Sequence, residues 1–324
     1  MSSRYEQFDR GRLRAFPVSQ RRNLVSLDDV LALGEAPEPF EHPDLPAVAD
    51  AVAAAVRREA SVVLLIGAHV IKQGLSRYVI DLIERGWVSV VAANGACTIH
   101  DYELALQGAT SESVAENIRD GRFGLWRETA TLNEIVTSGA SDGLGFGEAV
   151  GQAIDEGDLP HKDVSIFAAA WRAGVPATVH VGIGYDILHE HANFDGAAAG
   201  EASCRDFLIF TKVMEQLEGG AVLCYGSAVM GPEVYLKALS MVRNVASREG
   251  REIRHFTSAV FDLVRLESQN LGAEAPKDTP EYYYRPYKTV LVRTVADGGS
   301  SHYIRGDHRA TLPALHRLLT ERLT

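Results

Sequence analysis

The sequence lacks the features that mark several large classes of protein. Three cysteines (Cys97, Cys204 and Cys224) in 324 residues are too few and too scattered for a disulfide framework or a cysteine-rich zinc site. No apolar run approaches the ~20 residues that a membrane span needs. The first 23 residues mix arginine with acidic residues and hold no apolar core of a secretory signal. We therefore expect a cytoplasmic protein without a membrane partner.

The sequence is also poor in positive charge. Lys and Arg number 32 against 43 Asp and Glu, so the formal net charge is -11 at pH 7. A nucleic-acid-binding surface needs a basic face that neutralises phosphates, and the acidic balance therefore argues against nucleic acid as a partner. Apolar residues make up 46% of the chain, which is ordinary for a folded protein with a large core.

Alternating strand and helix patterns predict the fold class. Short, β-branched runs predict strands at 61–66, 88–93, 177–181, 221–225, 256–263 and 288–293. Helical patterns fall at 71–85, 101–107, 111–119, 128–137, 145–156, 164–172, 203–217, 233–247 and after Pro313. Repeated strand-then-helix order predicts an α/β fold with a doubly wound, mostly parallel, Rossmann-like sheet.

The beginning of the sequence differs from the rest. Residues 1–45 are polar and carry four prolines, so we expect an N-terminal arm with little regular structure. From residue 46 onward the pattern predicts a single α/β catalytic domain that extends to residue 324.

Polar and glycine-rich loops follow four of the predicted strands. In open α/β sheets, ligands bind where strands end and helices begin. Glycine lets backbone N–H groups approach a phosphate, and a helix N-terminus favours negative charge. Four such loops on one sheet predict an extended, phosphate-bearing ligand, and a dinucleotide fits. The candidate cofactor-binding residues are Gly67, His69, Gly74, Asn94, Gly95, Ala96, Gly182, Gly184, Asp186, Gly226 and Ser227.

These loops also have plainer interpretations. The loop after the first strand, which contains Lys72, is equally typical of a simple turn with a solvated lysine. His100 and Asp101 form an adjacent pair that could supply a base and a carboxylate, or could cap a helix. The Gly182-x-Gly184 pair lacks the third glycine of a dinucleotide fingerprint.

The same segments resemble the deoxyhypusine synthase superfamily. The resemblance is carried by GAHVIKQGL (67–75), ANGACTIHDYELAL (93–106), GIGYD (182–186), GSAVMGPEVYLKALSMVRN (226–244) and HYIRGDHRATLPALHRLL (302–319). Together these segments extend over most of residues 46–324 in the family's order. The resemblance implies an NAD-binding cleft lined by the glycine loops.

The resemblance also implies a reaction. NAD would oxidise an amine carbon to an imine, and a lysine would carry the alkylamine fragment to a small amine or a protein acceptor. The family's Trp-Gly-Lys segment becomes Pro286-Tyr287-Lys288 here, so Lys288 is the lysine by position and Lys72 is the second candidate. His100 or His180 would act as base, and Asp101 or Asp186 would position a cationic amine or a ribose hydroxyl.

A second resemblance implies a different outcome from the same first step. NGACTIHDYELALQG (94–108) and NEI (133–135) are similar to the archaeal and cyanobacterial type of ornithine cyclodeaminase, an NAD-using lyase. In that enzyme the imine is attacked within the same molecule, and the product is then reduced. Both resemblances imply a small-molecule amine substrate and a homotetramer with clefts between subunits.

Two further classes of function stay open from the residues alone. His189, His191 and Asp195 are close enough in sequence for a zinc or iron site, although their spacing matches no metal signature and no metal ligand is assigned. A non-catalytic, NAD-binding homologue is the other alternative. We expect an NAD-dependent aminoalkyl transferase or lyase.

Overall fold

The computed structural model describes residues 3–36, 39–267 and 271–324. The strands are β1 (Asn23–Ser26), β2 (Val62–Ile66), β3 (Val90–Ala93), β4 (Ala109–Glu112), β5 (Ala177–Val179), β6 (Ala221–Tyr225), β7 (Thr257–Asp262) and β8 (Ser300–Arg305). The α-helices are α1 (Leu45–Arg57), α2 (His69–Lys72), α3 (Ser76–Glu84), α4 (Gly95–Gln107), α5 (Val114–Asn117), α6 (Arg127–Ser141), α7 (Phe146–Glu156), α8 (Ile166–Ala173), α9 (Gly196–Met214), α10 (Met230–Arg248), α11 (Pro280–Tyr283) and α12 (His308–Leu323). Short 3-10 turns are η1 (Arg10–Arg12), η2 (Val18–Gln20), η3 (Leu27–Asp29), η4 (Lys162–Val164) and η5 (Ile187–Glu190), and η6 (Pro286–Arg293) is a π-helix.

The main sheet confirms the doubly wound α/β prediction. Within the described residues it has six strands in the order β5-β3-β2-β6-β7-β8, and every neighbouring pair is parallel. Counted along the chain, these six strands lie in the order 3-2-1-4-5-6, which is the order of doubly wound sheets that bind dinucleotides. The order reverses between β2 and β6, so their carboxyl ends form the topological switch point.

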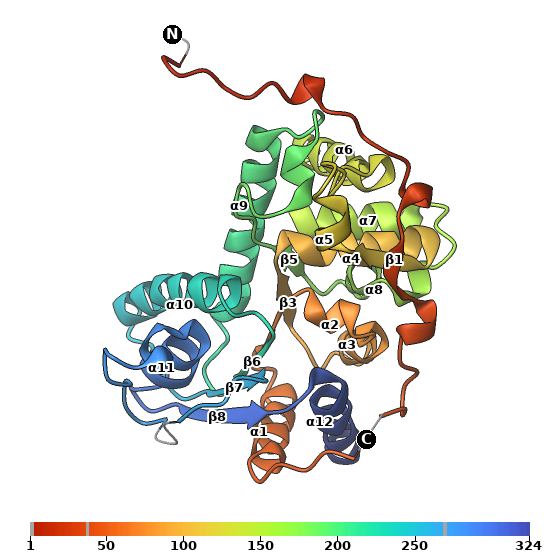
Figure 1. Cartoon of the computed structure of the whole chain (residues 1–324). Helices are drawn as coiled ribbons and strands as arrows, with labels where there is room; N and C mark the ends of the chain where they lie inside the picture. The colour runs from red at the N-terminus through yellow and green to blue at the C-terminus, as the bar shows by residue number, and fades with distance from the viewer. Residues whose placement is uncertain (1–2, 37–38, 268–270) are drawn as a thin grey trace.

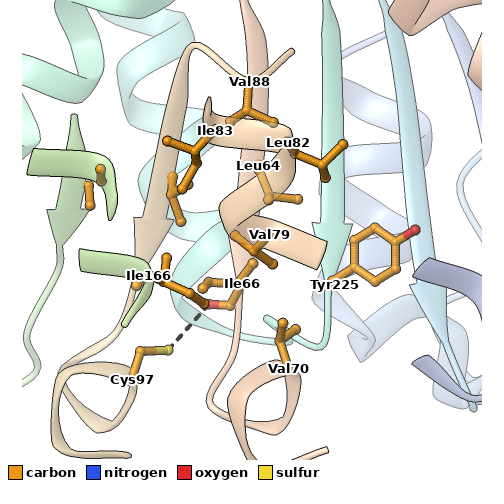
Figure 2. Close-up of a cluster of buried hydrophobic side chains, with 14 of the residues drawn as sticks. Leu64, Ile66, Val70, Val79, Leu82, Ile83, Val88, Cys97, Ile166 and Tyr225 are labelled. Carbon is orange, nitrogen blue, oxygen red and sulfur yellow. Dashed lines mark hydrogen bonds between the residues drawn. The ribbon is translucent and has the colours of Figure 1, made fainter. Parts of the chain in front are cut away.

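Helices cover both faces of this sheet. Figure 1 shows α9 and α10 on one side and α3, α8 and α12 on the other. The central strand β2 is buried along its whole length, with Leu64 and Ile66 facing the α3 side (Figure 2) and Leu65 facing the α10 side. Burial of such a side chain stabilises the fold by about 1.5–3 kcal/mol. This two-sided burial explains why the central strands are continuous apolar runs.

The predicted strand at 288–293 is wrong, because this segment is the π-helix η6. A short apolar run fits a buried helix as well as a strand, and periodicity does not separate the two. Here Val290 and Leu291 pack into the core on the α10 side, and their carbonyls accept hydrogen bonds from Ser258 Oγ (2.8 Å) and Ser301 Oγ (2.7 Å). These bonds hold η6 across β7 and β8. The edge strand is β8 instead.

The predicted helix at 111–119 is also wrong over its first part. Residues 109–112 form β4, which pairs antiparallel with β1 from the N-terminal segment, and only the short α5 is helical. The partner strand lies more than eighty residues earlier in the chain, so local periodicity does not reveal the pairing. None of the helices in the described ranges is both long and apolar enough to cross a membrane.

A buried ion pair fixes the N-terminal segment to α4. The two terminal guanidinium nitrogens of Arg21, Nη1 and Nη2, donate to the Glu103 carboxylate at 2.8 and 2.7 Å. Each of the two side chains is 1% exposed. Thr110 and Thr129 donate to the same carboxylate at 2.6 Å each. Both carboxylate oxygens of Glu103 therefore accept two hydrogen bonds each, from residues of three different segments of the chain.

We predict that Arg21→Ala lowers the free energy of unfolding by about 3–5 kcal/mol, because it leaves Glu103 as an uncompensated buried charge. Urea unfolding measures the change. The matched control is Arg22→Ala, since Arg22 is 76% exposed and lies 3.6 Å from Glu116. Loss of that exposed pair should cost less than about 1 kcal/mol. Similar losses in both variants would contradict the assigned role of Arg21.

Candidate functional site

The turns after β2 and β6 touch each other at the switch point. A Cβ atom on Gly67 would lie 2.2 Å from the carbonyl oxygen of Gly226, so no side chain fits there. The Gly67 N–H donates to the Tyr225 carbonyl at 2.9 Å, which continues the parallel pairing past the strand ends. Gly226 has a φ of +64°, a conformation that favours glycine. The backbones of Gly67 and Gly226 therefore meet between the two halves of the sheet with no side chain from either residue. We call this pair of residues the bare floor.

Two histidines flank this floor, and sequence analysis missed one of them. A Cβ on Gly226 would lie 3.0 Å from His308 Nε2 and 4.0 Å from His69 Cβ. His308 is 7% exposed, and its Nδ1 is buried without a hydrogen-bond partner. Burial lowers the pKa of His308, and the Asp262 carboxylate partly opposes that shift. In the sequence, the signal for this residue was the pair Asp307-His308, which follows β8 after one glycine.

The end of β7 adds an acidic group beside His308. Asp262, the last residue of β7, accepts a hydrogen bond from Tyr284 Oη at 2.6 Å. The Gly306 N–H donates to the Asp262 carbonyl at 3.1 Å, so the turns after β7 and β8 are tied together. Burial, with the hydrogen bond to Asp262, raises the pKa of Tyr284 and keeps its proton in place. The carboxyl ends of β2, β6, β7 and β8 therefore converge on one cluster.

The loop after β5 places Asp186 against the N-terminus of α4, the helix that follows β3. A Cβ on Gly95 would lie 2.3 Å from Asp186 Oδ2, and the Ala96 N–H donates to the Asp186 carboxylate. Asn94 caps the same helix by accepting a bond from the Cys97 N–H at 3.2 Å. Burial raises the pKa of Asp186 to about 6. The structure thus brings together Asn94, Gly95, Ala96 and Asp186.

His100 and Lys72 lie near this loop. His100 Nδ1 is 2.8 Å from Thr110 Oγ1, which in turn donates to Glu103. Burial lowers the pKa of His100 to about 4, and the positive charge of Lys72 adds to that effect. The imidazole is therefore neutral near pH 7, as a general base must be.

Asp101, the neighbour of His100, is held by α8. It is fully buried and accepts bonds from Ser165 Oγ (2.5 Å) and from the N–H groups of Ile166 (2.8 Å) and Phe167 (3.3 Å). The carboxylate thus caps the N-terminus of α8. Burial raises its pKa to about 6.

The loop after β5 has a buried base and an exposed tip. His180 Nε2 lies 3.0 Å from Thr178 Oγ1, and its ring contacts Phe210 edge to face. Burial lowers the pKa of His180 to about 4. Gly182 is half-buried, whereas Gly184 is exposed and has a φ of +91°.

Three other predicted site residues have structural contacts of their own. Lys288 is 8% exposed on η6, and its ammonium lies 3.3 Å from the centroid of the Tyr282 ring, a cation–π contact. A Cβ on Gly74 would lie 1.9 Å from the Asp29 carbonyl, so this glycine makes room for the N-terminal segment. Ser227 Oγ accepts a bond from the Gly231 N–H at 2.9 Å and shapes the turn into α10.

The three residues considered for a metal have separate local roles. His189 Nδ1 accepts a bond from the Gly184 N–H at 3.0 Å, and His191 Nε2 lies 2.9 Å from the Gly124 carbonyl. Asp195 caps α9 by accepting bonds from two backbone N–H groups. In the ranges that the structure describes, no group of three or more His, Cys, Asp or Glu side chains is arranged to hold a metal ion.

Cys97, next to the polar loop, is a core residue. It is fully buried, and its thiol points to the Ile66 carbonyl at 3.9 Å (Figure 2). Burial raises the pKa of the Cys97 thiol to about 12, so it is not a reactive thiolate near neutral pH.

Comparison with known proteins gives a fold and no family. No protein-family model matches the sequence, and no curated protein matches it. ArgZ, an arginine dihydrolase of the cyanobacterial ornithine-ammonia cycle, aligns over 87% of this chain with 13% identity and a TM-score of 0.50. Unliganded AgrE aligns over 86% with 17% identity and the same TM-score. The chain covers 33% and 32% of those proteins, about one third of their length.

Weaker alignments reach two more structures. AgrE in a ternary complex with ornithine and NAD+ aligns over 88% of this chain and 34% of its own, with 14% identity and a TM-score of 0.47. A protein assigned as a deoxyhypusine synthase, from Entamoeba histolytica, aligns over 86% of this chain and 90% of its own, with 8% identity and a TM-score of 0.45. The ArgZ and unliganded AgrE alignments show a shared α/β fold.

The raised pKa of Asp186 predicts a pH-dependent stability. Burial raises this pKa to about 6, above the value of about 3.9 in an unfolded chain. The folded protein therefore holds the proton more tightly, and stability falls as the pH rises from about 4 to about 6. Asp186→Asn removes this titration, so it should be more stable than the wild type at about pH 7 and equal to it at about pH 4.

Urea unfolding across this pH range measures the difference. Asp142→Asn, at an exposed position at the end of α6, controls for the substitution itself. An Asp186→Asn offset that does not change with pH would contradict the burial of this carboxyl against α4.

Proposed function

We propose that this protein is an NAD-dependent enzyme that oxidises an amine-bearing carbon to an imine. The observation that carries the proposal is the switch point between β2 and β6, where Gly67 and Gly226 leave bare backbone within van der Waals contact. Doubly wound sheets with this strand order bind dinucleotides at that point, and glycine is what lets a pyrophosphate approach the backbone.

Two features of the site fit a dinucleotide. Gly67 and Gly226 leave the strand ends without side chains, and an added Cβ would meet the Gly226 carbonyl at 2.2 Å or His308 Nε2 at 3.0 Å. His308 turns Nε2 toward Gly226, where this nitrogen could bond a phosphate or ribose oxygen, and its Nδ1 is a buried polar atom without a partner. Gly67, His69, Gly226, Ser227 and His308 would hold the cofactor. When bound, NAD accepts a hydride from the amine-bearing carbon and can return it.

The chain itself would handle the proton and the charge of the amine. An ammonium must lose a proton before its carbon gives up a hydride, and a neutral imidazole can take it. Burial lowers the pKa of both His100 and His308, so both rings are available as bases near pH 7. Asp262 and Asp186 carry the carboxyl groups that would position the cationic amine.

Transfer and cyclisation share this first step and differ in what attacks the imine. In transfer, a lysine amine attacks the imine carbon, and the original amine leaves with a proton. Lys72 supports this route, because it lies at the end of α2, in the loop after β2, close enough to His100 to lower its pKa. Lys288 is engaged by the Tyr282 ring. In cyclisation, a second amine of the same substrate attacks, and neither lysine becomes attached.

We predict that Gly226→Ala abolishes NAD binding. The added Cβ would lie 3.0 Å from His308 Nε2 and would intrude on the bare floor. Gly174→Ala is the matched control, because Gly174 has nearly the same φ (+65° against +64°) and nothing within 4 Å of its Cβ. Both substitutions carry the left-handed backbone cost of about 1 kcal/mol, so only the cofactor site differs.

Native mass spectrometry with added NAD measures the bound nucleotide per subunit. The wild type and Gly174→Ala should bind, and Gly226→Ala should not. Absence of NAD from the wild type at high concentration would refute the proposed function. The same spectrum reads the number of subunits, for which we propose four.

We predict that Lys72 is the attachment site if the reaction is a transfer. With NAD and a labelled amine, sodium borohydride would reduce a lysine imine to a stable amine. Lys72→Met should lose the label, and Lys288→Met should keep it. Label that persists in Lys72→Met and disappears in Lys288→Met would reverse the assignment. Turnover without label in the wild type would favour cyclisation.

A further inference from the structure

A polar hollow lies beside the candidate site and takes no part in the steps above. Its volume is about 720 Å³. Tyr303 and Arg305 line it from the end of β8, Arg265 from the loop after β7, and His42 and Asp44 from the segment before α1. The hollow lies next to the cluster that contains Asp262, because Arg305 is opposite Asp262 in the sheet register and Tyr303 lies beside Tyr284 and Asp262.

The two arginines of this hollow form no ion pair with the described residues. Arg265 is exposed and makes no hydrogen bond or ion pair with any part of the chain that the structure describes. Among the described residues Arg305 donates only through Nε, to the Leu263 carbonyl at 3.3 Å, and its two terminal nitrogens make no hydrogen bond there. Neither guanidinium group is paired with a carboxylate of the described residues, and two such groups in one hollow favour an anion.

A fixed frame supports these guanidinium groups. Tyr303 Oη donates to the Val264 carbonyl at 2.5 Å, which ties the residue before Arg265 to β8. Tyr303 and Arg305 alternate with the core residue Ile304, so both lie on the same face of β8. Arg265 and Arg305 are therefore presented from two strand ends that one hydrogen bond holds together.

One acidic group lies in the same hollow. Asp44 Oδ1 is 3.9 Å from His302 Nδ1, and its side chain is 48% exposed. Among its described residues, the lining thus offers two arginines and one carboxylate. This charge pattern is complementary to an amino acid, which carries a carboxylate and an ammonium.

We propose that Arg265 and Arg305 bind the carboxylate of an amino-acid substrate and that Asp44 faces its ammonium group. This inference rests on the proposed function, and it narrows the substrate from amines in general to amines that carry a carboxylate. A polyamine has only cationic groups, and two free guanidinium groups would repel it. A guanidinium fork matches a carboxylate with two parallel hydrogen bonds.

Two pairs of probes isolate the carboxylate. Ornithine and 1,4-diaminobutane differ only by that group, as do lysine and 1,5-diaminopentane. Isothermal titration calorimetry of the full chain, with and without NAD, should show about tenfold tighter binding of the carboxylated member of at least one pair. Arg265→Gln and Arg305→Gln should each remove this preference. Arg317→Gln, at a 60% exposed side chain of α12, should retain it.

The outcomes separate the proposal from its alternatives. Equal binding within both pairs by the wild type would overturn the carboxylate site. Weaker NAD binding in Arg265→Gln and Arg305→Gln, with the preference unchanged, would assign these arginines to a dinucleotide phosphate and would also overturn it. A wild type that binds no NAD refutes the proposed function, whereas the titrations without NAD still test the two arginines. Arg265→Gln is the cleaner variant, because Arg265 makes no hydrogen bond or ion pair within the described ranges.

Discussion

The close contact between Gly67 and Gly226 is the constraint on which the candidate site depends. Parallel pairing of β2 with β6 runs in register to Ile66 and Tyr225, so the residues that follow meet backbone to backbone. A side chain at Gly67 would collide with the Gly226 carbonyl and force the two strand ends apart. The strand order also reverses at this point, and such a reversal creates the crevice in which these sheets bind their ligands.

The N-terminal segment and the C-terminal helix α12 support the loop after β2. Arg309, in the first turn of α12, donates to the carbonyls of Gln73 (3.1 Å) and Asp29 (3.4 Å), which joins α12 to the loop after β2 and to the N-terminal segment. Gly74 admits that segment at van der Waals distance. The loop that carries His69 and Lys72 is thus supported on both sides. A supported loop keeps polar groups oriented before a ligand arrives, which lowers the entropy cost of binding.

Burial sets the protonation of the site more than charge pairing does. Desolvation is the largest cause of the lowered pKa values of His100 and His308 and of the raised pKa of Asp186. Neutral imidazoles and carboxyl groups that titrate near pH 6 suit proton transfer from an amine. The exposed arginines of the neighbouring hollow contrast with this interior, because they keep their charge and carry the anion selectivity that we propose.

The sequence by itself determined the alternation of strands and helices, since apolar runs and amphipathic spacing are local properties. It also placed glycines at Gly67 and Gly226, where a strand must give way to a turn. Only the tertiary structure decided which loops meet. In the tertiary structure η6 is a helix whose carbonyls accept hydrogen bonds from Ser258 and Ser301. His308, from near the C-terminal end of the chain, lies at the switch point. Such contacts depend on strand order, and no local pattern encodes the order in which parallel strands assemble.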